Sequence, residues 1–190
     1  MISSRVNRAK REAIKRIRKN FSGMTVLDLG CGPGSSASLF ENADYTGIDI
    51  NRKYIKAARR RYPRMTFKVG DAARGWEGHF DIILINSLLH HLDDRSVLRV
   101  LVGAASSLNP EGEIILQEPL YPFLDEKLCL LLVWLDQGNH FRTLTRWKRL
   151  VSEAGLYPRE MFFYSLRLAG LRVYQMVSLN LVLDALLRRD

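Results

Sequence analysis

Short, nearly continuous apolar runs alternate with segments of helical periodicity along most of the chain. The apolar runs predict buried strands at residues 24–29, 45–50, 66–69, 80–86 and 113–117. The helical patterns predict a helix beginning at residues 35–41 and further helices at 52–62, 95–108 and 147–154, the last stopped by Gly155. Strands that are apolar throughout and separated by helices are typical of a parallel sheet covered on both faces.

Two further β-like runs lie near the end of the chain, at residues 161–168 and 173–183. Only residues 169–172 separate them, which fits a hairpin but is too short for a helical crossover. The seventh strand is therefore expected to run antiparallel to the others. We predict a single α/β domain over residues 1–190, with a seven-stranded, mostly parallel sheet and helices on both faces.

The chain of 190 residues has a net charge of +9, which is concentrated in two segments. Residues 1–20 hold eight Lys and Arg against one Glu, and residues 52–64 hold seven Lys and Arg without an acid. In the first segment apolar residues recur at helical spacing, so residues 1–21 are predicted to form a basic amphipathic helix. Its charged face is either simply solvated or contacts an anionic membrane surface, a nucleic acid or an acidic substrate.

The composition excludes several classes of protein. Two cysteines are too few for a disulfide scaffold or a Cys-rich zinc site. The first twenty residues lack the continuous apolar stretch of a secretory signal, and the longest apolar run, residues 128–135, is too short to span a bilayer. These features predict a cytoplasmic protein, with peripheral membrane contact through residues 1–20 as an open alternative.

The segment VLDLGCGPGSS, residues 26–36, leads from the first predicted strand through three alternating glycines. Glycine permits unusual backbone angles and lacks the Cβ that would keep a ligand away from main-chain N–H groups. The dinucleotide pattern G-x-G-x-x-G would need glycine at Ser35, and the Gly-Lys-Ser/Thr run of a phosphate loop is absent. The segment is either a ligand-binding turn with little provision for a pyrophosphate or a plain tight turn.

Two acidic residues at the ends of the next predicted strands favour the ligand-binding interpretation. Asp49 closes the second strand, about where a carboxylate can accept hydrogen bonds from both hydroxyls of a ribose. Asp71 follows the third strand. Because ligands of open parallel sheets bind at the carboxyl ends of the strands, both side chains are expected at one edge.

These segments resemble the class I S-adenosylmethionine-dependent methyltransferases, especially the small type that acts on quinones, lipids and natural products. The resemblance is strong over residues 20–118, covers 119–183 in outline, and implies a Rossmann-like sheet with an antiparallel seventh strand. Residues 80–92 resemble the fourth motif of the family, and LNPEGE at 108–113 resembles its L-x-P-G-G turn, with Glu111 in place of the first glycine. The cofactor-binding residues that the resemblance implies are Asp28, Gly30, Cys31, Gly32, Gly34, Asp49, Ile50, Asp71, Ala72 and Asn86.

Methyl transfer from a sulfonium needs orientation, closeness and sometimes a base, so neither a catalytic triad nor a metal cluster is expected. His90 and His91 follow the fourth strand and are the candidate bases, with packing of the cofactor loop as the alternative role. Residues 119–142 mix an apolar stretch with polar residues and are expected to cover a small, partly apolar acceptor. The candidate acceptor contacts are Glu118, Tyr121, His140 and Arg142.

The predicted function is transfer of a methyl group from S-adenosylmethionine, with S-adenosylhomocysteine as product, to a small molecule by in-line displacement. Two alternatives stay open: an RNA or ribosome methyltransferase that uses the basic segments, and a non-catalytic cofactor-binding subunit that serves a partner. No Asn/Asp-Pro-Pro-aromatic run follows residue 85, which argues against methylation of nucleobase amino groups.

Overall fold

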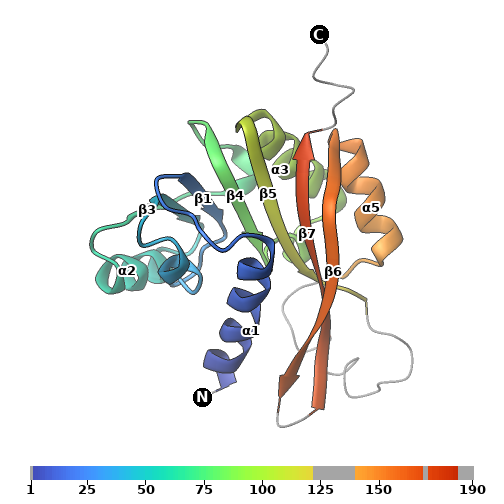
Figure 1. The fold of residues 1–190 in the computed structure, drawn as a ribbon, viewed down its shortest axis with the longest axis horizontal. Coiled ribbons are helices and arrows are strands. Elements are labelled where there is room, and N and C mark those ends of the chain that lie inside the picture. The colour runs from blue at the N-terminus through green and yellow to red at the C-terminus, as the bar shows by residue number, and fades with distance from the viewer. Residues whose placement is uncertain (1, 122–139, 169–170, 184–190) are drawn as a thin grey trace.

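The computed structural model describes residues 2–121, 140–168 and 171–183. Its strands form one sheet in the order β3-β2-β1-β4-β5-β7-β6, in which β7 runs antiparallel to β5 and β6 and the other pairs are parallel (Figure 1). The strands are β1 Thr25–Leu29, β2 Asp44–Asp49, β3 Thr66–Val69, β4 Phe80–Asn86, β5 Leu108–Pro119, β6 Leu156–Leu168 and β7 Leu171–Leu183. The α-helices are α1 Ile2–Ile17, α2 Arg52–Arg61, α3 Asp94–Ser106 and α5 Leu144–Glu153. None of the helices in the described ranges combines the length and the hydropathy that crossing a bilayer requires.

Helices cover both faces of the sheet because its central strands are apolar on both sides. In β4, Ile82 and Leu84 pack in one core with side chains of α1 and α2. The alternate residues, Ile83 and Ile85, pack in a second core with side chains of α3 and α5. All four are fully buried, and burial of one such side chain contributes about 1.5–3 kcal/mol. Strand β4 therefore holds the two helical layers together.

The predicted fold class, an α/β domain with a seven-stranded sheet and an antiparallel seventh strand, is confirmed. Strands β3 and β4 have the bounds that their apolar runs predict. The antiparallel pairing of the two C-terminal strands is also confirmed, since β6 and β7 are paired as far as Leu168 and Leu171. Other elements are longer than predicted: β5 extends over Leu108–Pro119, and α5 begins at Leu144 because the Thr143 hydroxyl caps its first turn.

The helix predicted to begin at residues 35–41 is wrong. These residues form turns and one short 3-10 helix, Ala37–Leu39. Ala37 and Phe40 are fully buried, and β2 already begins at Asp44. The chain must therefore return to the sheet before a second helical turn can form, and Ser35 and Ser36 are weak helix formers in any case.

The order of the strands opens a crevice beside β1. Strand β1 lies between β2 and β4. The chain first adds β2 and β3 on one side of β1 and then crosses over to add β4 on the other side. At such a switch point the connections diverge and leave space at the carboxyl ends of the strands. The glycine segment after β1 and the residues after β4 therefore face each other across this space.

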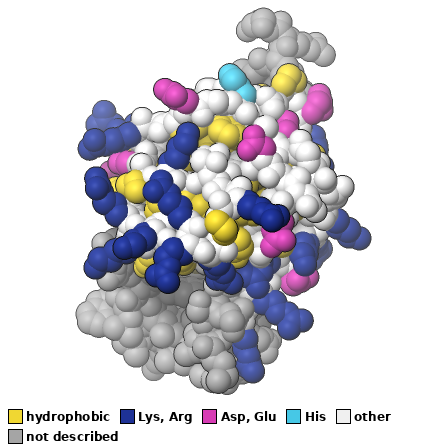
Figure 2. Space-filling model, turned by 90° about the vertical axis from the view of Figure 1, so that its left-hand side faces the viewer, with side chains coloured by type: hydrophobic (Ala, Val, Ile, Leu, Met, Phe, Trp, Pro, Cys, Tyr) yellow, Lys and Arg dark blue, Asp and Glu magenta, His cyan; other side chains and the backbone are white. Residues whose placement is uncertain are grey.

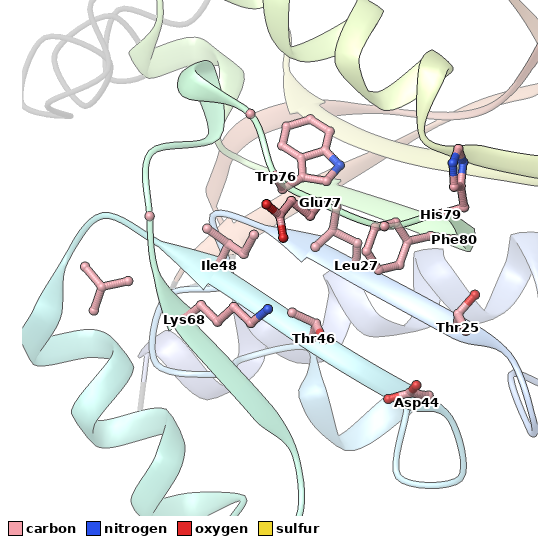
Figure 3. A pocket seen from close by; sticks show the side chains of 14 residues that line it. Thr25, Leu27, Asp44, Thr46, Ile48, Lys68, Trp76, Glu77, His79 and Phe80 are labelled. Atoms are coloured by element: carbon pink, nitrogen blue, oxygen red, sulfur yellow. The ribbon is translucent and has the colours of Figure 1, made fainter.

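A hollow of about 440 Å³ lies on the sheet face that looks toward α3 (Figure 3). The β3–β4 connection has one short 3-10 helix, Ala72–Arg74, and no α-helix to cover this part of β2 and β3. Leu27 and Ile48 lie beneath the hollow, and the indole of Trp76 stands along its side (Figure 3). None of the site residues predicted from the sequence lines it.

Candidate functional site

The glycine segment turns sharply at three positions that require positive φ. Gly30, Gly32 and Gly34 have φ of 71°, 55° and 77°, which L side chains rarely adopt. A Cβ at Gly30 would lie 2.9 Å from Cδ1 of Leu88, so a side chain there would force Leu88 to shift. A Cβ at Gly32 would meet nothing within 4 Å. The turn is therefore packed at Gly30 and open at Gly32.

A large cleft of about 490 Å³ opens at this turn. It is lined by Gly30, Gly32, Ile48, Asp49, Ile50, Asn51, Tyr54, Gly70, Asp71, Ala72, Ser87, Leu88, His91 and Leu92. These residues come from the ends of β1, β2, β3 and β4, as the strand order requires. The volume lies within the range of about 300–1,000 Å³ that is usual for small-molecule sites.

The Asp49 carboxylate is fixed at the rim of the large cleft by two main-chain donors. Its Oδ2 accepts the N–H of Gly32 at 2.8 Å, and its Oδ1 accepts the N–H of Asn51 at 2.8 Å. Each oxygen keeps a second lone pair for a further hydrogen bond. The side chain is thus held in one orientation while it can still accept from a ligand.

Asp71 lies on the same cleft, at the end of β3. Its Oδ1 accepts the N–H of Ala73 at 2.9 Å, and its Oδ2 lies 3.5 Å from Nε of Arg74. This is the capping arrangement that a lone Asp after a strand usually adopts. Ile50, predicted beside Asp49, also lines the cleft and is 70% exposed.

A small hollow of about 180 Å³ adjoins the large cleft and shares Gly30, Gly32 and Ser87 with it. It is lined by Asn7, Lys10, Asp28, Gly30, Cys31, Gly32, Ser35, Ser36, Asn86 and Ser87. Helix α1 closes one side of it, because Lys10 Nζ donates to Ser87 Oγ at 2.7 Å and Arg11 donates to the carbonyl of Ser35 at 3.1 Å. Sequence reasoning missed Lys10, since periodicity shows which side of the helix is basic but not which lysine meets the loop.

Asp28 is the buried acid of the small hollow. It is 2% exposed, and Tyr45 Oη donates to its Oδ2 at 2.8 Å. Burial raises the pKa of Asp28 to about 7, although the hydrogen bond from Tyr45 lowers it. Burial likewise raises the pKa of the neighbouring Cys31 thiol well above its ordinary value. Cys31 therefore packs as a thiol against Gly47, where a Cβ would lie 2.9 Å from its Sγ.

Glu118, a candidate acceptor contact, lies inside the protein. It is fully buried, and its Oε1 accepts the N–H groups of Leu88 and Leu89 at 2.9 and 2.7 Å. Its Oε2 lies 2.7 Å from Nδ1 of His90 and accepts the N–H of that residue at 3.3 Å. Glu118 was expected to contact the acceptor, but in the structure it anchors the loop after β4. This loop carries Leu88 into the large cleft.

Arg142 is buried in the same region, although it too was expected to contact the acceptor. Its Nε donates to Asp94 at 2.7 Å, and its other nitrogens donate to the carbonyls of Leu89, Leu92 and His140. Burial of Asp94 raises its pKa, but the hydrogen bonds from Arg142 and Arg146 outweigh this effect and lower the pKa overall. Arg142 therefore ties the start of α3 to the segment before α5.

The remaining candidates lie nearer the surface. His91 is exposed and lines the large cleft, whereas His90 is 5% exposed and lines neither hollow. Tyr121 is 49% exposed, and the N–H of the exposed His140 donates to the carbonyl of His90 at 3.0 Å. The segment predicted to cover the acceptor, 119–142, falls for the most part outside the described residues, as does the apolar run 128–135.

The structure brings the predicted cofactor residues together. Asp28, Cys31 and Asn86 line the small hollow, the pairs at 49–50 and 71–72 line the large cleft, and Gly30 and Gly32 line both. Gly34 lines neither and lies at the base of the turn, where a Cβ would come within 3.0 Å of the Tyr62 ring. The two hollows form one continuous candidate site, with carboxylates at the rim of the large cleft and one lysine in the small hollow.

Comparison with known proteins agrees with this arrangement. The model of the methyltransferase domain family matches residues 2–160 of the chain. A trans-aconitate 2-methyltransferase of Methylobacterium radiotolerans is 37% identical over 99 residues, which cover 49% of this chain and 37% of that protein. One from Shigella dysenteriae is 32% identical over 155 residues, which cover 78% of this chain and 52% of that protein. The chain thus spans about half the length, or less, of these curated relatives.

Solved structures show the same fold at lower identity. A SAM-dependent methyltransferase of Leishmania major superposes with a TM-score of 0.75 at 18% identity, covering 93% of this chain and 72% of that one. The magnesium protoporphyrin IX methyltransferase of Synechocystis superposes with a TM-score of 0.73 at 20% identity, covering 95% of this chain and 83% of that one. Together with the match of the family model, these likenesses show that the chain belongs to the methyltransferase domain family and has the class I S-adenosylmethionine-dependent methyltransferase fold.

Proposed function

We propose that the protein transfers a methyl group from S-adenosylmethionine to a small, partly apolar molecule. The observation that carries the proposal is the Asp49 carboxylate, which two backbone N–H groups fix at the rim of the large cleft. When bound, S-adenosylmethionine supplies a methyl group on a positively charged sulfur, which is a good leaving group. The protein therefore has to bind, orient and bring together the reactants rather than create a strong nucleophile.

The residues of the large cleft and of the small hollow fit the chemical parts of this cofactor. The lone pairs that Asp49 keeps suit the two hydroxyls of a ribose. Asp71 and Ala72, on the same cleft, would hold the adenine. In the small hollow, the Lys10 ammonium would pair with the carboxylate of the amino-acid part. The open space beside Gly32 leaves the main chain accessible to the ligand.

One observation supports a small acceptor, and a second supports an acceptor with an apolar part. The curated relatives are named for trans-aconitate, which is a small molecule. In this chain, Ile48, Leu88 and Leu92 give the large cleft apolar lining. An apolar lining with a few polar groups is typical of sites for small organic molecules.

Within this proposal the two histidines have different roles. His90 is buried and bound to Glu118, so it positions the loop after β4. His91 is exposed on the large cleft and is the histidine that would accept a proton from the acceptor. The ring centroids of the pair are 4.1 Å apart, so displacement of His90 would also move His91.

Formation of S-adenosylhomocysteine tests the proposal. The protein is incubated with S-adenosylmethionine and separate acceptors: trans-aconitate, phenols, quinols, fatty acids and RNA. We expect turnover with a small molecule and none with RNA, and a lower kcat for His91→Asn at unchanged cofactor affinity. Turnover with RNA alone would contradict the proposal, and cofactor binding without turnover on any acceptor would favour the non-catalytic alternative.

A further inference from the structure

The cations of α1 and α2 form one surface, which we term the basic face. It consists of exposed Lys and Arg side chains from the two helices and the residues that follow them. Its members are Arg5, Arg8, Lys15, Lys19, Arg52, Lys53, Lys56, Arg59, Arg60, Arg61 and Arg64. Arg16 is not counted because it lies over the Phe162 ring of β6, at the other edge of the sheet. The two groups are far apart in sequence, so only the fold can show whether they act together.

Both helices belong to the same layer of the molecule. Ile14 of α1 packs in one core with Ile55 and Ala58 of α2, on one side of the sheet. The outward sides of α1 and α2 therefore look away from the same sheet face. Figure 2 views the side of the molecule on which α2 lies and shows Lys and Arg side chains dominating over Asp and Glu.

Few acids neutralise this surface. In α1 one ion pair involves a residue of the basic face, Lys15 with Glu12 at 3.5 Å, and both side chains are more than half exposed. Within the described residues, Lys53 and Lys56 of α2 have no acidic partner within 4.0 Å. Clustered cations of one sign produce a positive potential that attracts an extended anionic surface.

The basic face also carries exposed apolar side chains and borders the proposed active site. Ile50, Tyr54 and Val69 are 70%, 48% and 45% exposed around the first turn of α2. Ile50 and Tyr54 also line the large cleft, and Lys10 of α1 lines the small hollow. Apolar side chains among cations suit a lipid headgroup region, whereas RNA is bound by cations with several stacking aromatics, of which this corner offers Tyr54.

We propose that the basic face docks the protein onto an anionic lipid membrane surface. The cations contact acidic headgroups, and the apolar side chains beside the cleft reach the boundary of the acyl chains. Docking in this orientation places the mouth of the cleft at the membrane, where a lipid-dissolved acceptor would be present. The proposal concerns binding alone, so it holds or fails independently of the acceptor and of methyl transfer.

Sedimentation with vesicles tests the docking, with the intact protein and matched variants. Lys53→Gln/Lys56→Gln removes two charges from the basic face, and Arg99→Gln/Lys148→Gln removes two exposed charges from α3 and α5 in the opposite layer. We expect binding to vesicles of phosphatidylglycerol and phosphatidylcholine, none to phosphatidylcholine alone, and release by salt. The first variant should bind about 25-fold more weakly, at roughly fivefold per charge, and the second like the unaltered protein.

Three results would overturn the proposal. The first is equal binding to neutral and anionic vesicles. The second is equal weakening in both double variants, which would indicate attraction by net charge without a docking face. The third is tight binding to poly(U) RNA under conditions where anionic vesicles are not bound, which would assign the face to nucleic acid. Circular dichroism of each variant shows whether it is folded before binding is compared.

Discussion

The Asp28 carboxyl group makes the stability of the protein depend on pH. Asp28 is buried beside the glycine turn, with Tyr45 Oη as its hydrogen-bond donor. Burial raises its pKa from 3.8 to about 7, so the folded protein keeps this proton at pH values where the unfolded chain has lost it. The substitution Asp28→Asn keeps the shape of the side chain and an acceptor oxygen for Tyr45, but it cannot ionise.

The sign and size of the effect follow from these two pKa values. Below 3.8 both states hold the proton, and above about 7 neither does. Between them the folded state binds more protons, so the free energy of unfolding falls as the pH rises, by about 1.4 kcal/mol per pH unit. The loss is complete near neutrality and amounts to at most about 4 kcal/mol. In Asp28→Asn this loss is absent.

Urea unfolding of the two proteins across this pH range measures the effect. We expect the stability of Asp28→Asn relative to the unaltered protein to increase steadily from about pH 4 to about pH 7 and then to level off. Tyr45→Phe serves as a control with the opposite effect on the pH dependence. Loss of the Tyr45 hydrogen bond removes an effect that lowers the pKa of Asp28, so the stability of this variant should fall more with pH than that of the unaltered protein. A stability difference between Asp28→Asn and the unaltered protein that stays constant with pH would refute the reasoning.

Three further predictions concern the site. Gly30→Ala adds a Cβ 2.9 Å from Leu88 at φ 71° and should lower the free energy of unfolding by more than about 2 kcal/mol in thermal unfolding. A Cβ at Gly32 would face open space, so Gly32→Ala should lower that free energy by about 1 kcal/mol and mainly weaken cofactor binding. Equal losses of stability would contradict this difference. Lys10→Gln should weaken S-adenosylmethionine binding about tenfold in calorimetry, and an unchanged affinity would remove Lys10 from the site. Glu118→Gln should lower the free energy of unfolding by about 1.5–3 kcal/mol in urea, since its amide NH2 would face the main-chain N–H of His90, and an unchanged midpoint would contradict the anchoring role.

The sheet could be predicted from the sequence because its strands are buried on both faces. Residues 66–69 and 80–86 are apolar runs whose ends coincide with those of β3 and β4. The hairpin followed from a gap too short for a crossover. The helix after the glycines was wrong because a local pattern does not show how soon the chain must return to β2.

The site could be predicted only in part, because a local pattern in the sequence does not show contacts between distant residues. Motif residues such as Asp49 and Gly32 follow strand ends, so the sheet itself brings them together. Glu118 and Arg142 were expected to contact the acceptor because they lie at the two ends of the segment predicted to cover it, and a position in the sequence does not show whether a charged side chain is exposed or buried. The fold buries both, and each makes four hydrogen bonds to neighbouring residues. Lys10 was missed because its contact with Ser87 joins residues distant in sequence.

Calorimetric titration with S-adenosylmethionine and S-adenosylhomocysteine tests most directly whether the large cleft is a cofactor site. We predict binding of each at about one molecule per chain in the micromolar range, and affinity at least about tenfold lower in Asp49→Asn, which loses the charge that strengthens hydrogen bonds from a ribose. Asp44→Asn, at the other end of β2 and outside the cleft, should bind like the unaltered protein. Failure of the folded, unaltered protein to bind either ligand, or undiminished affinity in Asp49→Asn, would contradict the account.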